Sequence, residues 1–259
     1  MSSTMSRTTR WGLLLIILFG AVGLRFWRIS SLPPGFHLDE SFEGLEAWHI
    51  LTDPTYRPIF LTGNFGVPVL NAYANALMFG LFRLWGGEVG PLAMRTTAAC
   101  FGVLGVWALY ALAGELRALD KTKTNLSPSF PLFAAAALAM MRWDIHFSRI
   151  GIEPILVPLL WASAVWLLLR GWRTGHWVNF VGCGLLVAAA VYTYQAAWII
   201  PLLMIPLTLL LFIQKPAPNV RYKIPTRRQL FHVALTALVA LLLFAPFGWY
   251  VWQHPDIVT

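Results

Sequence analysis

The sequence predicts an all-α membrane protein: a polytopic bundle of about seven transmembrane helices with a first outer loop that contains interfacial helices. Hydrophobic residues make up 58% of the chain and charged residues 12%, about half the charged share of an ordinary soluble domain. The apolar residues also form runs that approach or reach the roughly 20 residues needed to cross a bilayer. Most of this chain is therefore expected to lie in lipid and not in water.

The first apolar run predicts an uncleaved membrane anchor over residues 11–28. Arg7 and Arg10 precede it, as basic residues precede the apolar core of a signal peptide. The run ends at Arg25 and Arg28 without the small residues of a cleavage site, which favours a permanent crossing. The basic N-terminal residues predict that this end is cytoplasmic.

Charge decides which of the remaining apolar runs cross the membrane. Hydropathy marks eight candidates: residues 11–28, 68–85, 91–113, 131–143, 154–170, 178–193, 196–213 and 231–252. If all eight crossed, the Lys- and Arg-rich loops around 121–123 and 215–228 would face outward, against the positive-inside rule. The segment 68–85 is the weakest candidate because Asn71, Asn75 and Arg83 interrupt it, so we expect it to lie at the interface.

The resulting prediction is one transmembrane domain over residues 1–259. It consists of a first crossing at 11–28, an outer loop with interfacial helices at 29–90, and six further crossings within 91–252. The protein is expected to be a multi-pass protein of the plasma (inner) membrane whose functional face points outward. The basic residues form no stripe with interleaved aromatics, which argues against nucleic acid as a partner. Cys100 and Cys183 lie within apolar runs, which excludes a disulfide framework or a cysteine metal site.

Four acids follow the first crossing within eight residues: Asp39, Glu40, Glu43 and Glu46. On a helix, Asp39, Glu43 and Glu46 share one face while Glu40 points aside. Such a cluster is unfavourable beside anionic lipid headgroups unless a cation or a proton transfer uses it. The alternative is that Asp39 caps the helix and the following acids favour its dipole. The neighbouring His37 is either a ligand-binding residue or a hydrogen-bonded structural one.

A second polar cluster, residues 142–154, lies between two apolar runs. It contains two arginines, a histidine and two acids: Arg142, Asp144, His146, Arg149 and Glu153. An arginine at this position can bind phosphate through a bidentate fork, which lysine cannot form. The alternative is an arginine that snorkels from a helix end to the membrane surface.

Amide and tyrosine side chains form a third group of candidates. Asn64, Asn71 and Asn75 can meet sugar hydroxyls or merely solvate the polar face of an interfacial helix. Tyr192 and Tyr194, at the end of a crossing, can bind substrate or anchor the chain in the aromatic belt of the membrane.

Taken in order, these segments resemble the GT-C superfamily of integral membrane glycosyltransferases, in particular the branch with protein O-mannosyltransferases and lipid A aminoarabinose transferases. The resemblance rests on the pair Asp39-Glu40, the run 81–95, the turn 146–151 (His-Phe-Ser-Arg-Ile-Gly) and Tyr192-Thr193-Tyr194. It implies an inverting transfer of a sugar from a polyprenyl-phosphate donor to an acceptor hydroxyl. Asp39 would then be the catalytic base and Glu40 its companion.

The resemblance also implies the substrate contacts. The donor phosphate would meet Arg149, or Arg57 or Arg83, since Val67-Pro68 stand where some relatives have a phosphate-binding lysine. The remaining substrate-binding candidates are His37, Glu43, Asn64, His146, Glu153 and Tyr194. No cofactor is expected to be required, although a divalent metal beside the acids is compatible with the superfamily. The expected partners are a polyprenyl-phosphate-linked sugar, an acceptor protein, lipid or glycan, and membrane lipid.

Elementary chemistry agrees with this interpretation. A carboxylate can take the proton of the attacking hydroxyl, and guanidinium groups can stabilise the leaving phosphate. Two other classes stay open: a transporter or flippase for a lipid-linked sugar, and a non-catalytic membrane subunit. A transporter would place charges near the bilayer midplane and show paired repeats, whereas here the charges lie mainly at segment ends. Because relatives continue with further crossings, we expect this sequence to be an N-terminal portion of a longer enzyme.

Overall fold

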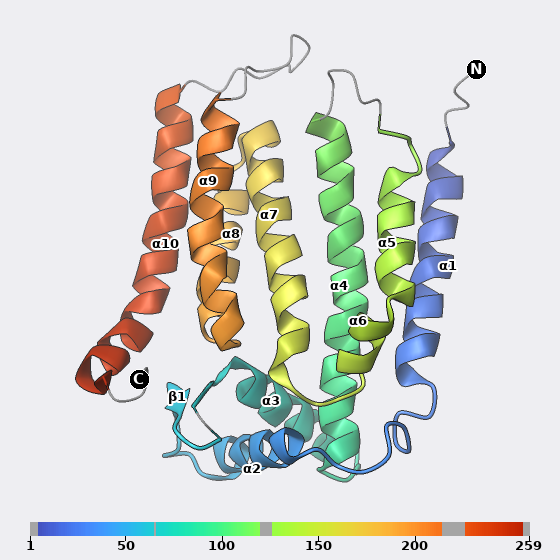
Figure 1. The fold of residues 1–259 in the computed structure, drawn as a ribbon, viewed down its shortest axis with the longest axis vertical. Coiled ribbons are helices and arrows are strands. Elements are labelled where there is room, and N and C mark those ends of the chain that lie inside the picture. The colour runs from blue at the N-terminus through green and yellow to red at the C-terminus, as the bar shows by residue number, and fades with distance from the viewer. Residues whose placement is uncertain (1–4, 65, 120–125, 214–225, 256–259) are drawn as a thin grey trace.

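The computed structural model describes residues 5–64, 66–119, 126–213 and 226–255. Upright helices form a bundle, and two shorter helices lie across one end of it (Figure 1). The upright helices are α1 (Arg7–Phe26), α4 (Pro91–Leu119), α5 (Phe130–Met140), α7 (Leu156–Thr174), α8 (Trp177–Val191), α9 (Ile199–Ile213) and α10 (Thr226–Gln253). The crosswise helices are α2 (Leu38–Thr52) and α3 (Leu70–Leu84), and we call this end of the molecule the α2–α3 end.

The all-α membrane class predicted from the sequence is confirmed. Within the described residues, five helices are long and apolar enough to cross a membrane, namely α1, α4, α9, α10 and the helical segment Glu153–Thr174 that contains α7. Two shorter apolar helices, α5 and α8, stand among them. The count of seven crossings stays a prediction. The excluded candidate 68–85 forms α3, which lies across the bundle end.

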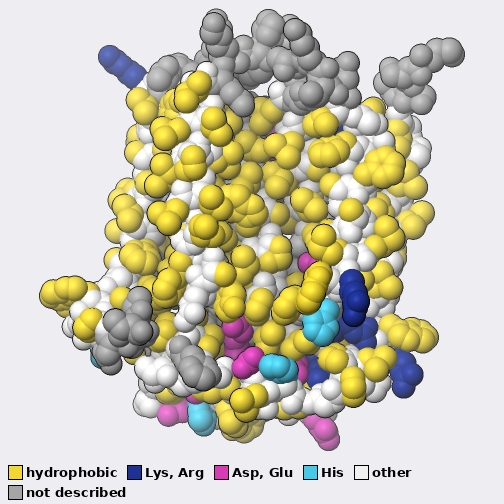
Figure 2. All heavy atoms as spheres, in the orientation of Figure 1, with side chains coloured by type: hydrophobic (Ala, Val, Ile, Leu, Met, Phe, Trp, Pro, Cys, Tyr) yellow, Lys and Arg dark blue, Asp and Glu magenta, His cyan; other side chains and the backbone are white. Residues whose placement is uncertain are grey.

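The short elements all lie near the α2–α3 end. A two-stranded antiparallel hairpin pairs β1 (Phe60–Leu61) with β2 (Val67–Pro68). A short helix α6 (Arg142–Phe147) and two 3₁₀ turns, η1 (Glu153–Ile155) and η2 (Gln195–Trp198), precede α7 and α9. Hydrophobic side chains cover the upright helices, and the acidic and histidine side chains visible on this face gather at the lower end (Figure 2).

The predicted crossing at 131–143 ends earlier than expected, and Arg25 binds the carbonyls at its end. Helix α5 ends at Met140, and α6 turns away from it. The buried guanidinium of Arg25 donates hydrogen bonds to Leu138 O (3.4 Å) and Ala139 O (3.2 Å), two of the last carbonyls of α5, and pairs with Asp144 of α6. Carbonyls at a helix end lack an intrahelical partner, so an arginine from α1 satisfies them here.

The helices of the bundle approach closely because small residues line their contacts. In α4, Ala98, Ala99 and Ala108 are fully buried. A Cβ atom added at Gly102 would overlap the Oγ atom of Ser148, so glycine permits the approach of α4 to the 148–151 turn. At the end opposite to α2 and α3, Arg173 of α7 binds Glu115 of α4 with two hydrogen bonds of 2.6 and 2.8 Å.

Candidate functional site

The candidate site lies at the α2–α3 end, where α2 passes the first turns of α4 and the turn that leads into α7. Figure 2 shows acidic side chains grouped there, with histidines beside them and basic side chains to one side. Residue His37 occupies the N-cap of α2, and the Glu40 carboxylate accepts a hydrogen bond from the His37 backbone N–H at 3.0 Å. The alternative interpretation, in which Asp39 caps this helix, is therefore wrong.

Asp39 presents a carboxylate to solvent, with 40% of its side-chain surface exposed. Its Oδ1 atom accepts a hydrogen bond from Asn64 Nδ2 at 3.0 Å, and its Oδ2 atom lies 3.3 Å from His37 Nδ1. Asn64 adopts a left-handed backbone conformation (φ 50°) in the turn between β1 and β2. The structure thus brings together three predicted site residues from two separate segments and leaves the carboxylate accessible.

Glu40 is buried, with 1% of its surface exposed. Its Oε1 atom accepts hydrogen bonds from Arg95 Nε (3.1 Å) and from the Gly151 N–H (2.8 Å), and its Oε2 atom accepts one from Arg95 Nη2 (3.2 Å). Arg95 also donates to two carbonyls of the 33–35 loop. One carboxylate therefore joins the loop after α1, the start of α2, α4 and the turn before α7.

Glu43 lies one turn further along α2 and is also buried. Its Oε2 atom accepts a hydrogen bond from Asn71 Nδ2 of α3 at 2.5 Å, while its Oε1 atom has no such partner among the described residues. The Glu153 carboxyl lies within hydrogen-bonding reach. Burial, followed by the neighbouring Glu153, raises the pKa of Glu43 well above its ordinary range. The raised pKa favours the protonated form of the Glu43 carboxyl at this buried position.

Two of the predicted phosphate-binding arginines are engaged with the backbone. Arg149 donates to the carbonyls of Leu24 (2.8 Å), Trp27 (2.6 Å) and Leu32 (3.1 Å), so it fastens the end of α1 to the 148–151 turn. Burial, followed by the charge of Arg95, lowers the pKa of Arg149.

Arg57 donates to three carbonyls between residues 50 and 56 at the end of α2. Arg83 instead lies with its guanidinium carbon 5.7 Å from the centre of the Trp48 ring.

The remaining predicted residues lie around this centre without joining it. His146 is exposed on α6 and stands edge-to-face against Trp143 and Phe147. Tyr194 is half-buried at the N-cap of η2, and the adjacent Gln195 donates a hydrogen bond to Gly66 O at 3.0 Å. Within the described ranges, no hydrogen bond or ion pair connects His146 or Tyr194 to Asp39.

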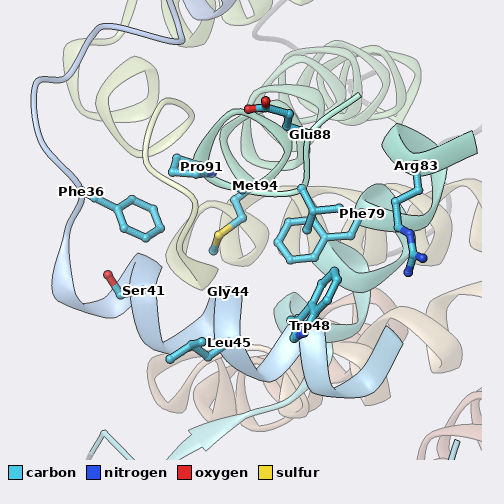
Figure 3. Close-up of a pocket in the computed structure, with 12 residues that line it drawn as sticks. Phe36, Ser41, Gly44, Leu45, Trp48, Phe79, Arg83, Glu88, Pro91 and Met94 are labelled. Atoms are coloured by element: carbon cyan, nitrogen blue, oxygen red, sulfur yellow. The ribbon is translucent and has the colours of Figure 1, made fainter. Parts of the chain in front are cut away.

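A pocket of about 770 Å³ lies beside α2 (Figure 3). The α2 residues that line it recur with helical spacing: Ser41, Gly44, Leu45 and Trp48. Asp39 and Glu43 fall on another face of the helix. Met94 lines the pocket and lies close to both Gly44 of α2 and Gly151.

Sequence reasoning did not identify the partners of the acids. Arg95 lies in the apolar run 91–113, where an unpaired charge is costly, so its position was the signal that a buried acid pairs with it. Asn71 was predicted to meet sugar hydroxyls or to solvate the polar face of an interfacial helix, but it is 1% exposed and binds Glu43. In the part of the chain that the structure describes, no three His, Cys, Asp or Glu side chains form a group that could hold a metal ion.

The fold is similar to the GT-C fold of the archaeal oligosaccharyltransferase AglB from Archaeoglobus fulgidus, whose structure was solved in complex with an inhibitory peptide and a dolichol-phosphate. AglB superposes with a TM-score of 0.67 over 92% of this chain, at 17% sequence identity, and this chain spans 29% of its length. At this identity the likeness shows the fold alone. Comparison with protein-family models and with curated proteins gives no match.

Proposed function

We propose that this chain carries the catalytic end of an inverting glycosyltransferase, which moves a sugar from a polyprenyl-phosphate donor to an acceptor hydroxyl on the outer membrane face. The observation that carries the proposal is the accessible Asp39 carboxylate, held by Asn64 and His37 at one end of a GT-C bundle. The AglB structure contains a dolichol-phosphate and a peptide, which supports a lipid-linked donor and keeps a protein among the candidate acceptors.

In this proposal Asp39 is the general base. Its carboxylate accepts the proton of the acceptor hydroxyl while the hydroxyl oxygen attacks the anomeric carbon of the sugar. The bond between that carbon and the phosphate oxygen breaks, and its electron pair leaves with the lipid phosphate. Phosphate is already a good leaving group, so no second carboxyl is needed as a general acid. Asn64 and His37 orient Asp39, and the buried Glu40 positions the start of α2.

Arg149 is the proposed donor contact. It joins the end of α1 to the turn before α7, where a lipid phosphate would sit with its tail along the bundle. Arg57 lies at the far end of α2 from Asp39, and Arg83 lies in the pocket on a different side of that helix from Asp39. His146, Glu153 and Tyr194 stay candidates for contacts to the sugar or the acceptor.

Replacement of Asp39 tests the proposal. In the full protein reconstituted in proteoliposomes, Asp39→Asn should lower transfer from a labelled polyprenyl-phosphate sugar by about a hundredfold or more, because the base is lost. Asp53→Asn is the matched control, since Asp53 is an exposed acid at the other end of α2 that binds Thr55. Full activity of Asp39→Asn would remove Asp39 from the mechanism. Movement of the labelled lipid across the bilayer without transfer would identify a flippase instead.

A further inference from the structure

Two adjoining hollows lie beside α2 and α3, away from Asp39. The first is the pocket of about 770 Å³ shown in Figure 3, and the second has a volume of about 520 Å³. Arg83 lines both, so its side chain stands at their boundary. Apart from Arg83, the second hollow is lined only by apolar residues or glycine: Leu51, Ala76, Leu77, Gly80, Leu81 and Leu84.

Arg83 is available to an anion. It is exposed near the end of α3, and its guanidinium rests on the face of Trp48. No carboxylate within the described ranges forms an ion pair with it, although Glu88 also lines the first hollow. Figure 3 shows the Glu88 carboxylate pointing away from the Arg83 side chain. An arginine fork beside an aromatic ring is well suited to a phosphate group.

The surroundings of Arg83 suit a hydrocarbon chain. Leu77 and Leu84 are 68% and 80% exposed on one side of α3, and Trp85, directly after the helix, is 80% exposed. An interfacial helix that exposes such side chains buries them in the boundary between headgroups and acyl chains, and tryptophan is enriched at that level. A cation at the mouth of an apolar hollow therefore matches an amphiphile with a phosphate head and an apolar tail.

We propose that these two hollows bind a membrane glycerophospholipid, whose phosphodiester pairs with Arg83 over Trp48 and whose acyl chain fills the hollow lined by Leu51, Leu77 and Gly80. A free phosphate would leave that apolar hollow unfilled. The polyprenyl-phosphate donor is a poorer occupant, because its sugar must reach Asp39 on a different face of α2; this one step rests on the proposed function. The lipid would fix α3 to the membrane surface.

Lipid retention by the delipidated full chain tests this site. Native mass spectrometry with added phosphatidylglycerol should show a tightly held lipid on the wild type and about tenfold weaker retention on Arg83→Gln. Arg142→Gln is the matched control, since Arg142 is an exposed arginine on α6, outside both hollows, and should retain lipid as the wild type does. Equal retention by Arg83→Gln and the wild type would overturn the proposal.

A second variant tests the chain-binding hollow without endangering the fold. A Cβ atom at Gly80 would meet only Leu51 Cδ1, at 3.7 Å, so Gly80→Leu fits on α3 and fills the hollow. It should weaken retention about tenfold while the melting temperature of the lipid-free chain does not fall, and unchanged retention would contradict the acyl-chain assignment.

Competition with three other ligands shows which molecule occupies the hollows. Diacylglycerol should bind weakly and inorganic phosphate should not displace the lipid, whereas strong binding or displacement would overturn the assignment. Displacement by polyprenyl phosphate at lower concentration would assign the hollows to the donor. None of these readouts depends on transferase activity, so they fail or succeed separately from the role of Asp39.

Discussion

The acids Asp39, Glu40 and Glu43 in the first turns of α2 differ in accessibility because their surroundings differ. Asp39 keeps 40% of its side-chain surface exposed, while Glu40 is enclosed by Arg95 and the Gly151 N–H, and Glu43 by Asn71 and Glu153. Burial and the neighbouring Glu153 raise the pKa of Glu43, and both glutamates are enclosed by protein groups, whereas Asp39 is open to solvent. Only the accessible acid can therefore meet a substrate without a rearrangement of the helix.

The proton held by Glu43 predicts a stability that falls as pH rises. Because burial and Glu153 raise the pKa of Glu43, the folded chain retains a proton that the unfolded chain loses above the ordinary value of 4.5. This contribution is complete below that pH and is lost as pH rises toward the folded-state pKa. Glu43→Gln keeps a neutral side chain of the same shape, so between about pH 5 and about pH 8 its melting temperature should fall less than that of the wild type, by about 3 °C or more.

The comparison requires a control for the general effect of pH. Glu88→Gln removes an exposed acid in the loop between α3 and α4 and should follow the pH dependence of the wild type. The charged groups that face Glu43 are Asp39 on its own helix and Glu153 of η1, while Asn71 of α3 is neutral and Glu40 is paired with Arg95 of α4. Equal pH slopes for Glu43→Gln and the wild type would show that the pKa of Glu43 is not raised in the folded chain.

At the scale of elements, the break between α5 and α6 involves an arginine from a distant helix. Arg25 caps two carbonyls of α5 and pairs with Asp144, which also begins the segment that carries Ser148 and Gly151 toward Glu40. The sequence shows Arg25 only as the polar end of the first apolar run. Its target lies more than a hundred residues away, so local patterns cannot reveal that it binds the end of α5.

Removal of this arginine should be strongly destabilising. Arg25→Met leaves Asp144 buried without its cation, which costs about 3–5 kcal/mol. Arg28→Gln, which changes an exposed arginine at the same helix end, should cost less than about 0.5 kcal/mol. The double variant Arg25→Met with Asp144→Leu should recover part of the loss, because no charge is then left unpaired. Reversible denaturation of the purified chain measures the three values, and a loss below about 1 kcal/mol for Arg25→Met would show that the pair does not support the fold.

At the scale of the whole molecule, composition and apolar runs predicted the class of fold because lipid imposes a strong pattern. Asn71, Asn75 and Arg83 excluded 68–85 as a crossing, and the segment forms the crosswise helix α3. The assembly of the site was less predictable. The contact between Asn64 and Asp39 depends on a hairpin turn with positive φ, and the burial of Glu40 depends on Arg95, 55 residues away. Periodicity identifies the faces of helices but not which distant faces meet.

The charge distribution predicts which end of the bundle faces the outside of the membrane. The positive-inside rule places the Arg- and Lys-rich connections inside, so the α2–α3 end should face outward and the α7–α8 connection inward. Glu88, between α3 and α4, and His176, between α7 and α8, are exposed at opposite ends of the bundle. With Cys100 and Cys183 replaced by alanine, a membrane-impermeant maleimide should label Glu88→Cys in intact cells. It should label His176→Cys only after the membrane is permeabilised. The reverse labelling pattern would place Asp39 on the cytoplasmic side and would contradict the proposed reaction at the outer face. Labelling of both positions in intact cells would contradict an odd number of membrane crossings between Glu88 and His176.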